Sequence, residues 1–235
     1  MSPLTGRIII ASLLGCLLVG AWGCSSAGSA RWERRTLATL QSHDPIAQRE
    51  ALLELEGPAT PAVRQAAEAI LRGSQDQFSR AMAADALARI GTPDSAEELR
   101  LSAGQDVSDE VRLRALRALV ALQGEGAADV LESAVAGDPE PTVRVTAVEL
   151  AARSLAPERA MPILLRALRD DSKAVRITAY QHLCALTGET LPLEDYEGWQ
   201  KAASARAAGA RQDAAPAPVQ PEGPVESTPA LEPEP

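Results

Sequence analysis

The sequence predicts an all-α protein in which helices pair and stack into an α-solenoid of about five helix pairs followed by a C-terminal capping helix. An alanine recurs every 32 residues, and a second apolar position follows each alanine by four residues. Glycines stand where the predicted helices end, and no segment of this region alternates polar and apolar residues as a strand would. A fixed period of this size indicates stacked helical units without one central core.

Four positions of the repeat hold similar residues in successive copies. The alanine position holds Ala51, Ala83, Ala115, Ala147 and Ala179, and the apolar position after it holds Leu55, Leu87, Leu119, Ala151 and Leu183. Three residues before each alanine stand Gln48, Arg80, Arg112, Arg144 and Arg176, preceded by Ala47, Ser79, Val111, Val143 and Val175. Residues four apart share one helix face, so the alanine and apolar positions predict the core.

The helices follow from these positions in order. We expect a first helix over 31–41 and a second from Asp44-Pro45 to Leu55, because aspartate before proline favours a helix start. Further pairs are predicted at 60–72 and 76–90, 94–103 and 108–122, 126–136 and 141–153, and 157–168 and 173–187. Their ends are marked by glycines that we expect in the left-handed conformation: Gly73, Gly91, Gly104, Gly124, Gly137 and Gly188.

The ends of a helical stack need polar outer surfaces, and each end of this one has a tryptophan. Trp32 lies in the first predicted helix, and Trp199 lies in a last helix over about 194–209. We expect both tryptophans to cap the stack. The solenoid then covers 31–210 and is followed by a disordered tail over 211–235, because residues 212–235 hold seven prolines, five acids and no base.

The repeat resembles the HEAT-like repeats named after phycobilisome lyases. The motif is an aspartate turn, then valine-arginine, then alanine and leucine, as in Asp106, Val111-Arg112, Ala115 and Leu119. The resemblance covers about 31–188. It implies that the arginines reach the turn aspartates and link neighbouring repeats, and that the helix carrying them lines the concave side.

The first 23 residues predict an export signal. A basic residue, Arg7, precedes an apolar run over 8–19, which small residues follow. Gly23-Cys24-Ser25-Ser26 after such a run resembles the lipobox of bacterial lipoproteins. This resemblance implies cleavage before Cys24, a lipid on Cys24, a short linker over 24–30, and an outer-membrane anchor facing the periplasm. Cleavage after Ala27 or Ala30 would instead release a soluble periplasmic protein.

Composition limits the possible functions. The formal net charge of -9 disfavours a nucleic-acid partner, which needs a basic surface. The two histidines, His43 and His182, do not stand at metal-ligand spacing, and the sequence has no phosphate-binding loop or nucleophile motif. We therefore expect no enzyme activity, cofactor, metal or small-molecule substrate.

The candidate binding residues are the outward positions of the arginine-bearing helices. These lie two, five and nine residues after each arginine and form one stripe. They are Met82, Asp85, Arg89, Arg114, Arg117, Thr146, Glu149, Arg153, Thr178 and Gln181, with Ala121 and Ala185 completing the pattern. The stripe holds four arginines, which favour carboxylates, so we expect it to contact an acidic segment of a partner, although an ordinary mixed-charge surface explains it equally well.

The sequence thus predicts a membrane-anchored scaffold or adaptor that binds another protein at the bacterial cell envelope. Two alternatives stay open at this point. One is a non-catalytic subunit or maturation factor, as the resemblance to HEAT-like lyases implies. The other is a structural envelope protein that associates with itself end to end.

Overall fold

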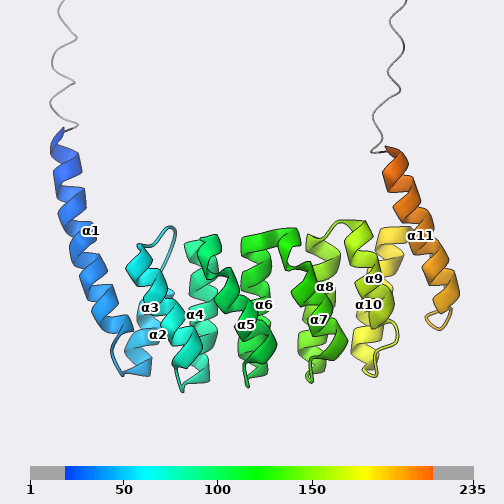
Figure 1. Ribbon diagram of the computed structural model, residues 1–235, viewed down its shortest axis with the longest axis horizontal. Helices are drawn as coiled ribbons and strands as arrows, with labels where there is room; N and C mark the ends of the chain where they lie inside the picture. The colour runs from blue at the N-terminus through cyan, green and yellow to red at the C-terminus, as the bar shows by residue number, and fades with distance from the viewer. Residues whose placement is uncertain (1–18, 214–235) are drawn as a thin grey trace, which may run out of the picture.

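The computed structural model describes residues 19–213 and the side chains of residues 29–206. Its helices form a single row of pairs, with α1 at one end and α11 at the other (Figure 1). The elements are α1 (Val19–Leu40), α2 (Pro45–Leu53), α3 (Pro61–Gly73), α4 (Gln77–Ile90), η1 (Pro93–Ser95), α5 (Ala96–Gln105), α6 (Asp109–Gln123), η2 (Gly124–Ala127), α7 (Ala128–Gly137), α8 (Pro141–Ser154), α9 (Pro157–Ala167), α10 (Lys173–Thr187) and α11 (Tyr196–Asp213). Within the described residues there is no strand, and the predicted all-α solenoid is confirmed.

The row has two layers. The first helices of the pairs are α1, α3, α5, α7 and α9, and each packs against the second helix of its own pair, namely α2, α4, α6, α8 and α10. Each layer is continuous, because every first helix also contacts the next first helix and every second helix the next second helix. We call the outer surface of the second helices the second-helix face.

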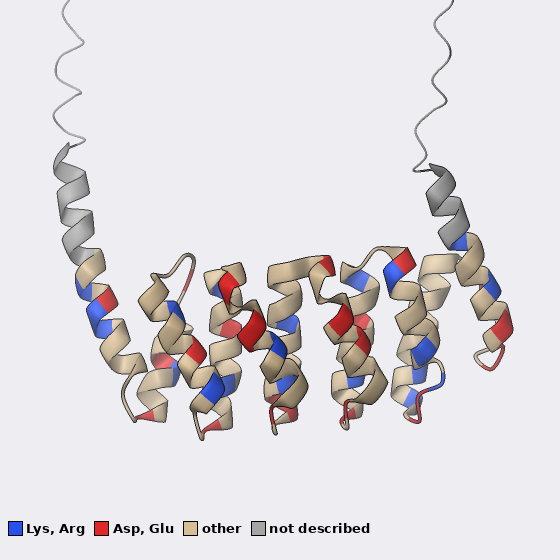
Figure 2. Ribbon diagram, viewed as in Figure 1, with Lys and Arg blue, Asp and Glu red and all other residues tan. Residues whose placement is uncertain are grey.

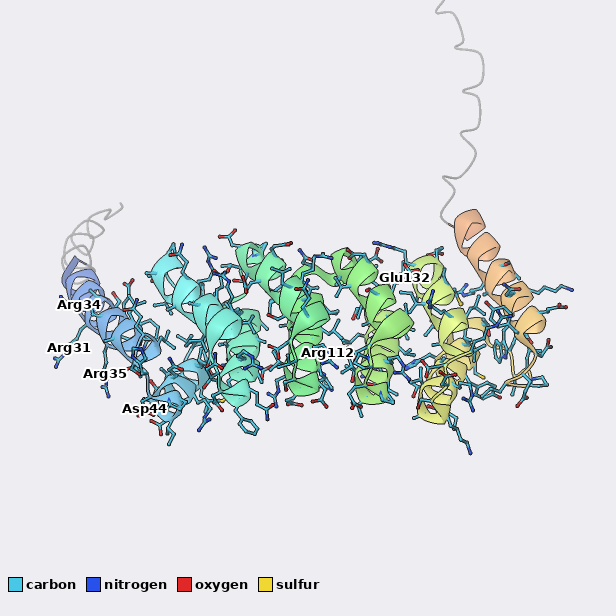
Figure 3. The ribbon with its side chains drawn as sticks, turned by 60° about the horizontal axis from the view of Figure 1, so that its bottom comes forward. Arg31, Arg34, Arg35, Asp44, Arg112 and Glu132 are labelled. Atoms are coloured by element: carbon cyan, nitrogen blue, oxygen red, sulfur yellow. The ribbon has the colours of Figure 1, made fainter. Side chains whose placement is uncertain are left out.

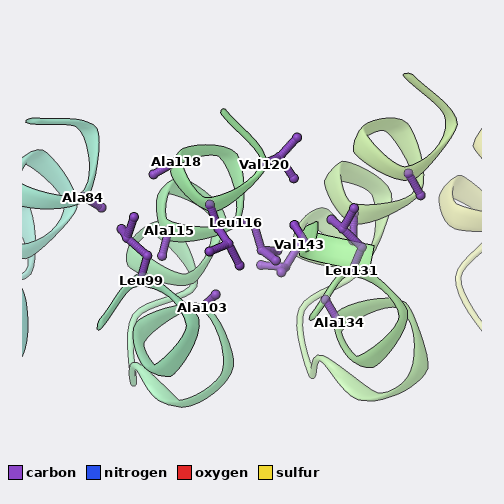
Figure 4. Close-up of a cluster of buried hydrophobic side chains, with 14 of the residues drawn as sticks. Ala84, Leu99, Ala103, Ala115, Leu116, Ala118, Val120, Leu131, Ala134 and Val143 are labelled. Carbon is purple, nitrogen blue, oxygen red and sulfur yellow. The ribbon is translucent and has the colours of Figure 1, made fainter. Parts of the chain in front are cut away.

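The core lies between the layers and is built from small side chains. The recurring alanines and the apolar residues four positions later are all buried, as predicted. Figure 4 shows how Leu99 of a first helix and Ala115 and Leu116 of the adjoining second helix meet in this seam, with Leu131 and Val143 in the next pair. Small alanine side chains allow the helix axes to approach closely. No pair could hide its apolar residues without its neighbour.

Helix α1 begins earlier than expected. It runs from Val19 through residues 24–30, where we expected a linker, and continues to Leu40. No proline interrupts this stretch, and alanine and serine are compatible with a helix. The chain therefore enters the first repeat as a continuous helix. The predicted signal residues 1–18 and the tail 214–235 lie outside the described residues.

The two tryptophans behave differently. Trp199 is fully buried, its Nε1–H donates to the Pro192 carbonyl at 2.9 Å, and its ring meets Tyr180 edge to face. Helix α11 packs against α9 and α10 and covers that end, as predicted. Trp32 is 42% exposed, so the prediction that it caps the first repeat is wrong. Thr36 and Leu40 on another side of α1 make that contact instead.

Candidate protein-interaction surface

Arginines of the second helices connect neighbouring repeats. Arg112 in α6 donates from Nε and Nη2 to the two carboxylate oxygens of Asp138, both at 2.8 Å (Figure 3 labels Arg112). Its Nη1 donates to the Asp106 carbonyl at 3.0 Å. The arginine–aspartate ladder consists of three pairs with this bidentate geometry: Arg80–Asp106, Arg112–Asp138 and Arg144–Asp170. The link between repeats that the family resemblance implied is therefore confirmed.

The aspartates of the ladder also shape the turns in which they lie. Oδ1 of Asp106 accepts from the Ser108 backbone N–H at 2.9 Å, two residues ahead, and Asp170 accepts from Ser172 in the same way. Burial raises the pKa of both carboxyl groups, but these N–H bonds and the paired arginines outweigh burial and leave the pKa below its usual value. The ladder groups are thus fully used within the fold and are not available to a partner.

The ladder is incomplete at both ends of the row. Gln48 replaces the first arginine, and its Nε2 donates to the carbonyls of Leu40 and Ser42 within its own repeat. At the last repeat position of this kind stands Arg176, whose Nη1 donates to the carbonyls of Asp170 and Asp171. No described residue accepts a hydrogen bond from Nε or Nη2 of Arg176, because α11, rather than a further helix pair, follows α10.

The predicted stripe lies on the second-helix face, but its members are not equally open. Arg89, Arg117, Arg153 and Gln181 are exposed, Met82, Asp85, Arg114, Glu149 and Thr178 are half-buried, and Thr146 is buried with 6% exposed. The prediction that Thr146 points outward is wrong, because α8 packs between α6 and α10 and these neighbours cover that position.

Two of the four arginines of the stripe are used inside the molecule. Arg89 donates to the carbonyls of Leu55 at 3.0 Å and Leu52 at 2.7 Å, at the end of α2. Arg114 forms ion pairs with Glu110 on its own helix and with Asp85 on α4. These contacts satisfy carbonyl and carboxylate groups of the fold, so neither guanidinium is free for a partner.

Arg117 and Arg153 remain the open cations of the stripe. Both are exposed, and neither forms a hydrogen bond or ion pair with any residue that the structure describes. They lie on α6 and α8, which are neighbours in the row. Figure 2 shows basic and acidic segments mixed along the repeats. The second-helix face thus offers two free guanidinium groups on adjacent helices, suited to carboxylates.

The structure also exposes apolar residues on the second helices that the sequence analysis did not select. Ile46, Leu53 and Phe78 are 59%, 60% and 58% exposed. Ile46 and Phe78 lie 32 residues apart and so share one repeat position, and Leu53 shares another with Arg117. Comparing outward positions across all copies, rather than charges alone, would have found them. The face therefore carries exposed apolar side chains in its first repeats, in addition to the two open cations further along.

Grooves run between neighbouring first helices on the other side of the row. A further groove, of about 750 Å³, lies between the α1–α2 junction and α3 and is lined by α3 residues such as Ala62 and Ala69 and by His43, Gln48 and Asp76. It lies at the repeat junction where Gln48 replaces the ladder arginine. The side chains that line it are mostly neutral, and nothing in it resembles a catalytic set.

Among the described side chains, no group of three or more histidine, cysteine, aspartate or glutamate residues is placed to hold a metal ion. Of the helices in the described part of the chain, none combines the length and the apolar character that crossing a bilayer requires. His182 has a lowered pKa because burial disfavours its charged form, and the charge of Arg153 lowers the pKa further.

Comparison with protein families agrees with this geometry. A family model for HEAT repeats matches residues 34–120 and 128–193, which is more than half of the chain. The chain belongs to the HEAT-repeat family. No curated protein matches it. HEAT-repeat proteins are helical scaffolds, often for protein binding, and are in general not catalysts, so the described fold provides a platform for a macromolecular contact.

Proposed function

We propose that this HEAT-repeat protein is a lipid-anchored scaffold that holds another protein at the bacterial cell envelope. The basic start, apolar run and Gly23-Cys24 of the N-terminus support export and lipid attachment. Helix α1 supports a direct mechanical link, because it continues from Cys24 into the first repeat. An anchor on Cys24 would thereby fix the orientation of the row relative to the membrane.

The partner contacts the second-helix face through an acidic segment. The observation that carries this proposal is the pair of exposed guanidinium groups of Arg117 and Arg153, with which no described residue forms a hydrogen bond or ion pair. Exposed Leu53 and Phe78 on nearby second helices add apolar area to the same face. A segment with carboxylates and at least one apolar side chain would match both features, because arginine and aromatic residues are typical of binding hot spots.

The alternative of end-to-end self-association receives no support from the ends of the row. Helix α11 buries Trp199 and covers the last repeat. At the other end, Arg31, Arg34 and Arg35 of α1 are exposed, and two such ends would not form an apolar seam. The absence of a catalytic set among the described residues gives no reason to prefer an enzyme subunit.

Crosslinking in intact cells tests the proposed surface. Arg117→Glu/Arg153→Glu should lose the crosslinked partner, since charge reversal repels carboxylates and neither side chain has an internal hydrogen bond or ion pair to break. Arg166→Glu/Arg206→Glu is the matched control, because both residues are exposed and lie on α9 and α11, away from the second-helix face. Equal recovery of the partner from the two variants would reject the surface.

Mass spectrometry of the mature N-terminus tests the anchor separately. We expect an N-terminal peptide that begins at Cys24 and carries acyl chains. A peptide that begins after Ala27 or Ala30, without lipid, would show a soluble exported protein and would leave the partner surface to be decided by the crosslinks.

A further inference from the structure

The outward face of α1 is basic, although the protein as a whole is acidic. Arg31, Arg34 and Arg35 are all exposed in a chain whose formal net charge is -9. Their i, i+3 and i+4 spacing puts them on one face of the helix. Thr36 and Leu40 are buried on the other side, against the repeats. Figure 3 shows the three arginines on the side of α1 that faces away from the row.

These three charges are not used within the fold. None of the three guanidinium groups forms a hydrogen bond or ion pair with the part of the chain that the structure describes. Glu33 stands between them in sequence, but its carboxylate accepts from the Thr60 hydroxyl at 2.7 Å, at the start of α3. Glu33 is therefore directed to the body of the protein. The local charge of the outer face is positive.

Trp32 adds an amphipathic ring beside this cluster. It is 42% exposed and follows Arg31 directly in the helix. Indole rings favour the boundary between water and lipid, where the apolar body is covered and the N–H stays hydrated. The combination of basic residues and tryptophan is typical of helices that lie at a membrane surface.

We propose that the outer face of α1, formed by Arg31, Trp32, Arg34 and Arg35, binds the headgroups of anionic lipids. The location rests on the proposed function, which attaches the chain to the membrane at Cys24. Along a helix, Arg31 to Arg35 lie about 10 to 17 Å from Cys24. That distance is about one to two Debye lengths in physiological salt, so the arginines reach the headgroups when α1 lies along the membrane surface and not when it stands upright on it. The contact orients the row and leaves its second-helix face open to the partner.

Lipid headgroups fit the cluster better than an acidic protein segment. The arginines stand at the end of the row nearest to Cys24, whereas Arg117 and Arg153 of the proposed partner surface lie on α6 and α8. Trp32 gains a favourable environment at a water–lipid interface, which an ion pair with a carboxylate alone does not provide. Binding of an acidic protein segment, including residues 214–235 of the chain itself, is the competing outcome of the test.

Vesicle sedimentation with the full chain carrying Cys24→Ser tests the proposal without a covalent lipid. The chain is mixed with vesicles of phosphatidylglycerol and phosphatidylcholine, or of phosphatidylcholine alone, at low and high salt. We expect preferential sedimentation with the anionic vesicles, which high salt removes. The leader of this chain carries Arg7 and adds its own attraction to anionic vesicles, but this contribution is the same in every variant and is removed when variants are compared.

Arginine variants identify the surface. Arg31→Gln/Arg34→Gln/Arg35→Gln should reduce the affinity for anionic vesicles by about fivefold for each arginine removed. The control, Arg117→Gln/Arg153→Gln/Arg166→Gln, removes the same charge from exposed positions on α6, α8 and α9 and should keep the preference. Circular dichroism checks that the helices of both variants are intact.

Two results would overturn the proposal. One is equal sedimentation with anionic and neutral vesicles. The other is an α1 variant that binds anionic vesicles as before but loses crosslinks to a protein or to the acidic tail, which would assign the cluster to a protein contact. Neither result depends on whether Cys24 is acylated, so failure of the lipid anchor remains a separate outcome.

Discussion

At the scale of single residues, each ladder arginine both pairs with an aspartate of the next repeat and donates to a carbonyl of the turn before its own helix. Arg144 binds both carboxylate oxygens of Asp170 in the next repeat at 2.7 and 2.8 Å, and its Nη1 donates to the Asp138 carbonyl at 2.7 Å. Lysine could not replace it, because only the planar guanidinium presents several donors in this fixed geometry. The position of an arginine in the repeat does not by itself determine its contacts, since Arg176 occupies the same position without a carboxylate partner.

Removing a ladder arginine should cost far more stability than removing the last one. Arg112→Ala leaves the carboxylate of Asp138, whose side chain is 5% exposed, without its partner. We expect a loss of about 3 kcal/mol in the free energy of unfolding. Arg176→Ala loses only bonds to two carbonyls and should cost about 1 kcal/mol. Urea titrations of both variants measure this, and equal losses would contradict a structural role for the ladder.

Acid should destabilise the protein by protonating the aspartates of the ladder. Asp106 and Asp170 have a pKa below the usual value, so the folded protein binds their protons less readily than the unfolded chain. This stabilisation is complete above the unfolded pKa of about 3.9 and is lost as the pH falls through the lower, folded pKa. Urea unfolding between pH 7 and pH 2.5 should show a free energy that falls below about pH 4. Asp170→Asn should show a smaller fall, and a stability independent of pH in this range would exclude the mechanism.

At the scale of elements, the glycines at the helix ends divide into two groups. Gly91 and Gly188 have φ of 72° and 76° and end their helices in the left-handed conformation. Gly124 also has positive φ, but its ψ of -118° lies outside the left-handed helical region, so the prediction is wrong there. The prediction is wrong for Gly73, Gly104 and Gly137, because none of them has positive φ. These three lie at the ends of first helices, where Ser74, Asp106 and Asp138 lead in extended conformation directly to the next helix.

Alanine substitutions should separate the two groups of glycines. Gly188→Ala places a Cβ on a residue with φ of 76° and should cost about 1 kcal/mol. Gly104→Ala in α5 has nothing within 4 Å of the new Cβ and should gain about 0.5 to 1 kcal/mol, because alanine is the better helix former. Thermal melts of the two variants should shift in opposite directions, and shifts in the same direction would contradict these assignments.

At the scale of the whole molecule, each repeat is stabilised by packing against the repeats next to it. Each pair contacts only its neighbours, and the last pair is closed by α11 and Trp199. The first repeats depart from the common pattern, since Gln48 stands in place of the arginine and Arg49 pairs instead with Asp76 at 2.7 Å. The last repeat is thus covered by a capping helix, whereas the first repeats are linked by the Arg49–Asp76 ion pair.

Replacing each of the two tryptophans with alanine should lower the stability of the row by different amounts. Trp199→Ala removes a fully buried side chain and should cost about 3 to 5 kcal/mol. We expect α9, α10 and α11 to lose hydrogen-exchange protection before the rest of the row, because contacts are between neighbours. Trp32→Ala should cost less than about 1 kcal/mol, as an exposed position predicts. Loss of protection at the first repeats in Trp199→Ala would argue against a stack of this kind.

The sequence by itself determined the all-α class, the pairing of helices, the buried positions and the ladder. This was possible because the same residue types recur every 32 residues, so each copy of the repeat supports the same helices and buried positions. Only the tertiary structure decided which surface charges are free. Arg114 and Arg117 look alike in the sequence, but Asp85 from the neighbouring helix reaches Arg114 and no described residue reaches Arg117. The exposure of Trp32 and the burial of Thr146 were likewise set by contacts between helices, which a pattern along one helix does not contain.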